Sequence, residues 1–383
     1  MGFDQAVLDD AELLASRDDG RMLWALATAG AQVRRSVSAT ADAGFDRLGG
    51  NDVPRAVLVC TDAAAVGVTR LLVRLSTSAA PIVGWHGADL PRWAGPADAV
   101  LIGSTDGRQP RQVRLVEQAA HRGLAMAVVA PAGTPLAEAA GRAPVVELPA
   151  DLHVRAARWS MLTPLLLAGG ALGVLTAPPD VLAAVADALD ETAESCRPQS
   201  DAFTNAAKAL AIEVTDSLPV VAGAGALASV AAALISDALQ LLAGVPAVAV
   251  ALPDGVARAG ALLRGSPTDF LDDEFFRDRD LESTVLRARL ITVGDDGDPQ
   301  DPVLGPKSDA ELALDELAAR RAASVLRGIA TQLGLRSSVI EVPTGPPLAR
   351  FAAATAFGDF TAAYVALGRG IDPSEPRPGE LGP

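Results

Sequence analysis

The middle of the chain alternates between continuous apolar runs and an amphipathic segment. Residues 98–105, DAVLIGST, are an apolar run that leads directly into a polar turn at 106–107. An amphipathic pattern follows over 110–122, and residues 124–130 are again continuously apolar. Apolar runs without alternation are typical of parallel strands that helices cover on both faces. The pattern therefore predicts a right-handed βαβ unit over 98–130, with the turn at the carboxyl end of its first strand.

The same succession of apolar runs and helical segments recurs on both sides of this unit. The other apolar runs predict strands at 55–60, 81–85, 144–148, 218–223, 246–252, 285–293 and 337–342. Strands that alternate with helices favour parallel sheets with helices on both faces. We therefore predict an α/β fold with two doubly wound parallel-sheet domains. Its parts are an N-terminal helical arm over 1–34, a first domain over 35–175, a linker helix over 176–200 and a second domain over 201–383.

Composition limits the class of protein. The chain has 383 residues, a net charge of −15 and 50% hydrophobic residues, but only 4% aromatic ones. The length suits two domains, and the negative charge argues against nucleic acid or an anionic membrane as a partner. The most apolar stretches, 161–176 and 218–252, are interrupted by glycine, proline or aspartate, and the N-terminus has no apolar signal-peptide core. We therefore expect a cytoplasmic protein without membrane spans.

Cysteine and histidine show no pattern typical of a metal site or a disulfide framework. Cys60 and Cys196 are far apart in the sequence, and His86, His121 and His153 lack the spacing of metal ligands. We therefore expect two buried free thiols, no metal and no cofactor.

Four segments together resemble the SIS (sugar isomerase) domain family. Residues 98–130 are similar to its strand, S-x-S-G-N-T phosphate loop, helix and strand, and residues 149–166 resemble its P-x-x-x-x-P-R-A-A segment. Residues 204–225, TNAAKALAIEVTDSLPVVAGAG, and residues 358–376, GDFTAAYVALGRGIDPSEP, resemble the entry and the end of its second domain. The bifunctional phosphoglucose/phosphomannose isomerases, with two SIS domains and an N-terminal arm, are the most similar members. The resemblance implies two SIS-type domains, a sugar phosphate or related small molecule as the ligand, and a homodimer.

The resemblance also implies which residues bind the ligand. In that family, hydroxyls and backbone amides of two loops at strand ends hold the phosphate. The first loop falls on 61–65, where the family's glycines and serine are absent and Thr61 and Asp62 are the candidates. The second loop supplies Ser104, Thr105, Asp106, Gly107, Arg108 and Gln109 as candidate substrate-binding residues. Asp106 replaces a phosphate-binding serine, and Arg108 is placed to offset its charge; the alternative is that Asp106 is a turn or helix N-cap residue.

The groups that isomerisation needs match the family less well than the ligand-binding loops do. Aldose–ketose isomerisation through an enediolate needs a carboxylate base, a histidine that opens the sugar ring and cationic groups. The resemblance places Leu241 at the base, Ala257 at the histidine and Gly382 near the lysine. Arg155, the arginine of the P-R-A-A segment, is the one catalytic candidate, and the alternative for it is a surface helix residue.

Three functions follow from this comparison of residues. The first is a sugar-phosphate or other carbohydrate-derivative binding protein in which isomerase chemistry is weak or lost. The second is an active isomerase that converts glucose-6-phosphate and mannose-6-phosphate to fructose-6-phosphate with relocated residues. The third is a non-catalytic dimeric scaffold or regulator, for which the apolar helices predicted at 226–242 and 347–368 are candidate dimer interfaces. Whether the protein is an enzyme stays open at this point.

Overall fold

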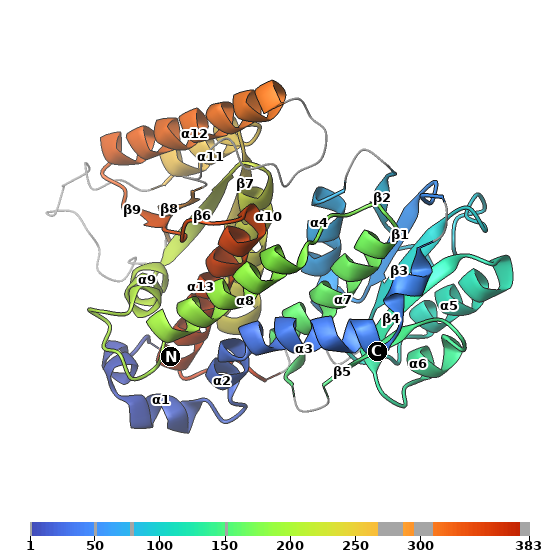
Figure 1. Ribbon diagram of the computed structural model, residues 1–383. Helices are drawn as coiled ribbons and strands as arrows, with labels where there is room; N and C mark the ends of the chain where they lie inside the picture. Colours follow the sequence, from blue (N-terminus) through green and yellow to red (C-terminus); the bar gives the residue numbers. More distant parts are fainter. Residues whose placement is uncertain are drawn as a thin grey trace, which may run out of the picture. The chain divides into compact units, whose positions relative to one another are not determined.

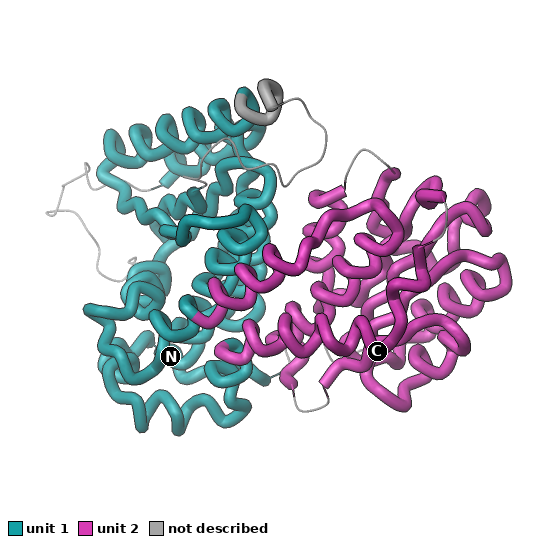
Figure 2. Tube along the Cα trace, viewed as in Figure 1, with its two compact units in different colours: residues 1–26, 191–300, 309–383 teal, residues 27–190, 301–308 magenta. Residues whose placement is uncertain are grey.

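The computed structural model describes residues 2–49, 52–76, 80–149, 152–266, 286–294 and 309–375. The chain divides into two compact units (Figure 2). Unit 1 contains residues 1–26, 191–300 and 309–383, and unit 2 contains residues 27–190 and 301–308. The residues predicted as one N-terminal arm are thus shared between the units. The arm forms short helices, which are η1 (Gln5–Asp9), α1 (Ala11–Arg17), α2 (Met22–Ala27) and the start of α3 (Ala29–Asp42).

Unit 2 contains a five-stranded parallel sheet with the order β2-β1-β3-β4-β5 (Figure 1). Its strands are β1 (Val57–Thr61), β2 (Ile82–Gly84), β3 (Ala99–Gly103), β4 (Ala125–Pro131) and β5 (Val145–Leu148). The chain reverses its direction of winding between β1 and β3, which confirms the predicted doubly wound sheet. In β1 and β3 every residue is buried, as expected of strands that are covered on both faces.

Helices cover both faces of this sheet. The helices of unit 2 are α3, η2 (Phe45–Leu48), η3 (Ala63–Ala65), α4 (Val66–Arg74), α5 (Pro110–Arg122), α6 (Pro135–Ala139), η4 (Val154–Ala156), α7 (Arg158–Ala171) and most of α8 (Pro179–Ser195). On one face, Leu115 and Val116 of α5 pack with Val100, Ile102 and Val128. On the other face, α7 crosses β3, β4 and β5. Helix α5 ends where predicted because Gly123 adopts a left-handed conformation with a φ of +73°.

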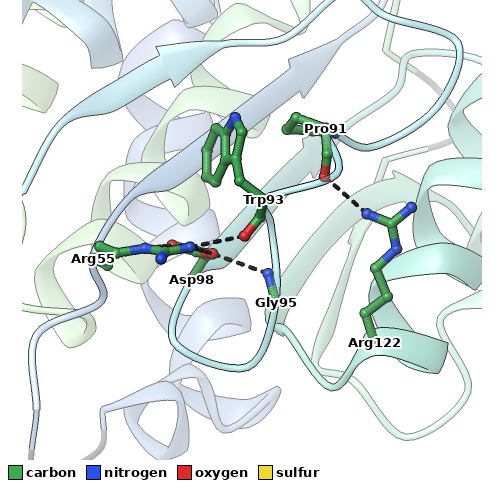
Figure 3. A network of polar contacts seen from close by, with 6 residues as sticks. All are labelled: Arg55, Pro91, Trp93, Gly95, Asp98 and Arg122. Carbon is green, nitrogen blue, oxygen red and sulfur yellow. Dashed lines mark hydrogen bonds and ion pairs between the residues drawn. The ribbon is translucent and has the colours of Figure 1, made fainter.

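A polar network closes the amino edge of the unit 2 sheet (Figure 3). Asp98, just before β3, is buried and accepts hydrogen bonds from Nε and Nη2 of Arg55 at 3.0 and 2.7 Å and from the Gly95 N–H at 2.9 Å. Arg55 also donates to the carbonyl oxygen of Trp93 at 2.8 Å. Burial alone would raise the pKa of Asp98, but the Arg55 and Gly95 hydrogen bonds outweigh it and hold the pKa below its ordinary value. The network therefore fixes β1 and β3 side by side.

Unit 1 contains a four-stranded parallel sheet with the order β7-β6-β8-β9. Its strands are β6 (Ser217–Ala224), β7 (Val248–Leu252), β8 (Arg287–Val293) and β9 (Ser337–Ile340). Its remaining helices are α9 (Ala206–Val214), α10 (Ala226–Ala243), α11 (Val256–Arg264), α12 (Asp309–Gln332) and α13 (Pro347–Gly368). Helices α11 and α12 cover one face (Figure 1), where Leu263 and Leu326 pack on Val220 and Leu290. This second parallel sheet completes the predicted α/β class.

The prediction that the final helix is a dimer interface is wrong. Nearly every residue of α13 is buried, and the helix packs along α10 and α9 within unit 1. Among the described residues, α10 and α13 are the helices long and apolar enough to cross a membrane, but 67% and 89% of their apolar windows are buried. Their low polarity is therefore explained by a position in the core, which leaves α13 no free face for a second copy.

The segment after α8, predicted as a linker, is held by side chains from unit 1. Tyr364 donates from its hydroxyl to the Cys196 carbonyl at 2.5 Å, and Asn205 donates to the Arg197 carbonyl at 3.1 Å. Lys208, which is fully buried, donates to the carbonyls of three other residues, two of them in this segment. Because buried carbonyl groups need partners, these side chains fix a stretch that has no regular structure of its own.

Candidate functional site

The two loops that the resemblance assigns to the ligand meet at the carboxyl edge of the unit 2 sheet. Strands β1 and β3 are parallel neighbours, and Thr61, the last residue of β1, pairs with Gly103, the last residue of β3. The loops that begin at Asp62 and Ser104 therefore leave the sheet side by side. Parallel α/β sheets bind ligands at this edge, at the point where the strand order reverses.

The carboxylate of Asp62 is the centre of this edge. Its Oδ2 atom accepts hydrogen bonds from the N–H and the hydroxyl of Thr105, at 2.5 and 2.8 Å, and from the hydroxyl of Ser104 at 3.3 Å. Its Oδ1 atom accepts from the N–H of Ala65, in the 3-10 turn before α4, at 3.0 Å. Asp62 is only 3% exposed. The first loop is thus tied to the second by a buried side chain.

Asp106 adopts the role of a turn residue. Its Oδ1 atom accepts from the N–H of Arg108, two residues further on, at 3.0 Å, which is the geometry of an Asx turn. The same oxygen lies 3.1 Å from the Ser104 hydroxyl, whose oxygen accepts from the N–H of Gly107 at 3.0 Å. Ser104 has one hydroxyl proton, so the carboxylates of Asp62 and Asp106 share it. These contacts therefore agree with the second interpretation of Asp106, that it is a turn residue.

Gly107 fixes the second loop against the connection after β4. Its φ of +63° is in the left-handed region, and a Cβ atom added there would lie 2.2 Å from Oγ1 of Thr134. The Gly107 carbonyl accepts from the N–H of Leu136 at 3.0 Å. Glycine is favoured at this position for two reasons: its φ is positive, and Thr134 lies too close for a Cβ atom.

Two residues of α5 that the sequence did not single out also hold this edge. Gln112 is fully buried and donates from Nε2 to the Gly103 carbonyl at 2.8 Å, and Arg111 donates from Nη2 to the Thr61 carbonyl at 3.1 Å. The signal that could have found them is their position in the first turn of the helix after the loop, on the face toward the strand ends. They bind the last carbonyls of β3 and β1, so they position both loops.

Arg155 lies at the same edge of the sheet by topology. It belongs to η4, just before α7, and a helix that follows a strand of a parallel sheet begins at the carboxyl edge. Met161 of α7 packs against Gly103, the last residue of β3, which agrees with this placement. The N–H of Arg155 donates to Nδ1 of His153 at 3.2 Å. Arg155 and Gln109 therefore remain candidate ligand contacts at this edge.

The positions that the resemblance assigns to proton transfer carry no titratable side chain among the described residues. Leu241, at the end of α10, and Ala257, in α11, carry alkyl side chains without a titratable group, and Gly382 lies outside the described residues. Burial raises the pKa of the Cys60 thiol to about 12, although Arg111 lowers it, so this thiol stays protonated at neutral pH. Within the described part of the chain, no three histidine, cysteine, aspartate or glutamate residues gather as metal ligands.

Comparisons with known proteins agree with this fold. Residues 309–378 match the family model of the bacterial phospho-glucose isomerase C-terminal SIS domain. A hypothetical protein from Thermus thermophilus is 15% identical with a TM-score of 0.68, over 98% of this chain and 93% of that one. A glucose-6-phosphate isomerase from Chlamydia trachomatis is 12% identical with a TM-score of 0.64, over 97% of this chain and 82% of that one.

A third structure extends the range of known proteins with this architecture. The C-terminal domain of glucosamine-fructose-6-phosphate aminotransferase from Francisella tularensis is 11% identical with a TM-score of 0.57, over 93% of this chain and 98% of that one. No curated protein sequence matches the chain. At these identities the structures show the fold, and the family model adds the class of the C-terminal segment. Residues 309–378 are therefore similar to the SIS domain of bacterial phospho-glucose isomerases, and the whole chain shares the fold of these structures.

Proposed function

We propose that this protein binds a carbohydrate derivative at the carboxyl edge of the unit 2 sheet and that its isomerase activity is weak or lost. The binding residues are the two loops, Thr61–Asp62 and 104–109, with Arg155 as the retained cation. The similar structures include a glucose-6-phosphate isomerase, which supports a sugar phosphate or a related molecule as the ligand. The proposal includes two SIS domains over 35–175 and 201–383, a homodimer and a cytoplasmic location.

One observation supports the loss of chemistry most strongly. The loops that would hold a ligand meet at one edge, whereas alkyl side chains occupy the positions of the base and of the ring-opening histidine. An enediolate mechanism moves a proton between C1 and C2, and a leucine or an alanine cannot accept one. These two positions therefore have no proton acceptor, which supports weak or lost isomerase activity.

Binding and turnover test this proposal separately. Calorimetry with glucose-6-phosphate, fructose-6-phosphate, mannose-6-phosphate and their unphosphorylated sugars should give heat with at least one of them, and an Arg155→Met variant should bind that ligand more weakly. No heat with any sugar would exclude a carbohydrate ligand.

A coupled assay for fructose-6-phosphate should show either no conversion of glucose-6-phosphate or mannose-6-phosphate above an uncatalysed control, or conversion far below about one turnover per second. Turnover at rates ordinary for enzymes, on the order of 1–1,000 per second, would exclude the loss of isomerase activity.

Light scattering on a sizing column tests the homodimer, for which the expected mass is twice the 39.0 kDa of the chain.

A further inference from the structure

The hydrogen bonds around Asp62 form a complete cradle for an anion. The donors are a backbone N–H and a hydroxyl of Thr105, the hydroxyl of Ser104 and the N–H of Ala65 in the turn that begins the next helix. Hydroxyls, backbone amides and helix N-termini at a strand end are the groups with which α/β proteins hold phosphate. In this chain a buried carboxylate of the protein itself occupies the cradle.

An incoming phosphoryl group would meet two obstacles at this position. The donors that face the centre of the cradle already bind Asp62, so the phosphoryl oxygens would have to displace a carboxylate that four donors hold. The phosphoryl oxygens would also approach the carboxylates of Asp62 and Asp106, which both accept a hydrogen bond from the Ser104 hydroxyl. Like charges at such distances repel, and the exposed Arg108 lies outside this set of contacts with its N–H bound to Asp106.

We propose that Asp62 determines specificity as a resident anion, which excludes phosphoryl groups from this edge of the sheet. The ligand bound here is therefore a carbohydrate derivative without a phosphoryl group at this position. The carbohydrate part of this inference rests on the function proposed above. The exclusion of phosphate rests on the contacts of Asp62 and of the neighbouring Asp106, without any assumption about the sugar.

Inorganic phosphate tests the exclusion without any sugar. Asp62→Ser removes the carboxylate, frees the donors of Ser104 and Thr105, and keeps a hydroxyl that can cap the N–H of Ala65. Asp62→Asn is the control for charge: its side chain still occupies the cradle without a negative charge, but its one amide oxygen can accept on only one side, so its NH2 group faces donors on the other. Far-UV circular dichroism and thermal melting establish that both variants fold.

Calorimetric titration with phosphate should show binding to Asp62→Ser at least about tenfold tighter than to the unmodified protein, with Asp62→Asn between the two, because it removes the charge but still fills the cradle. Phosphate binding by the unmodified protein as tight as by Asp62→Ser would overturn the inference. A folded Asp62→Ser that does not bind phosphate would also overturn it. Equal binding by Asp62→Asn and Asp62→Ser would show that a filled cradle is not what excludes phosphate.

A second titration compares fructose with fructose-6-phosphate on the same proteins. The Asp62→Ser change should shift the preference toward the phosphorylated sugar by about tenfold or more. Tighter binding of fructose-6-phosphate than of fructose by the unmodified protein would overturn the inference. If neither protein binds a sugar while Asp62→Ser binds phosphate, the proposed function fails and the role of Asp62 stands.

Discussion

Replacement of Lys208 by methionine should destabilise unit 1 more than any single surface change. Lys208 is fully buried, and its ammonium donates to the carbonyl oxygens of Leu8, Pro198 and Ser200, the last two at 2.7 and 2.6 Å. The Tyr364 ring lies 5.4 Å from Nζ. A lysine ammonium has three protons, so one residue satisfies three carbonyls from two separate segments of the chain. Methionine has a similar length and donates nothing.

The size of the effect follows from two opposing contributions. Three hydrogen bonds from a charged donor contribute about 1.5–3 kcal/mol each, and loss of the donor leaves the buried Leu8 carbonyl without its partner. Burial lowers the pKa of Lys208, although Asp9 and Asp201 raise it, so the ammonium has a desolvation cost of several kcal/mol that methionine avoids. The difference between these contributions predicts a loss of about 3 kcal/mol in the free energy of unfolding.

Thermal melting and hydrogen exchange measure this effect. A loss of about 3 kcal/mol in a unit of this size corresponds to a fall of roughly 6–12 °C in Tm. Exchange of backbone amides in residues 196–205 should increase first, because Lys208 and Tyr364 hold their carbonyls. Lys208→Arg is the control for charge and should also destabilise, because a planar guanidinium does not match three converging carbonyls. A change in unfolding free energy below about 1 kcal/mol for Lys208→Met would refute the reasoning.

Three further changes test other parts of the structure. Burial raises the pKa of Asp18 against the hydrogen bonds that lower it, so the unfolding free energy should fall as pH rises above 3.8 through the raised pKa. Asp18→Asn keeps one acceptor oxygen, for either the Met22 or the Leu23 N–H, and should lack this fall in pH-dependent melts. Gly107→Ala should cost about 1–3 kcal/mol by urea denaturation, and Thr134→Ala added to it should recover only part of the steric cost, because Cβ of residue 134 still lies 2.6 Å from the new methyl group. Asp98→Asn should cost about 1–3 kcal/mol by urea denaturation because Arg55 loses its paired acceptor, whereas no loss would show that the network is unimportant.

Local structure and the class of fold could be predicted from the order of residues in the chain. Apolar runs without alternation predicted the strands, and the βαβ unit over 98–130 appears as β3, α5 and β4 with the glycine stop where expected. These features depend on residues close together in the chain, so periodicity and turn residues suffice to predict them. The sequence also indicated that the loops after β1 and β3 carry the candidate site.

The tertiary structure alone decided which groups meet. Asp62 and Thr105 are 43 residues apart and meet because β1 and β3 are neighbours in the strand order, which periodicity does not specify. Lys208 meets the Leu8 carbonyl across 200 residues of sequence. The apolar sequence of α13 would suit a core helix or an interface helix equally well. Its packing on α10 shows that it is a core helix. Hydrophobic patterning indicates which residues are buried. It does not indicate which residues distant in sequence come into contact, because that depends on how the strands and helices are arranged in space.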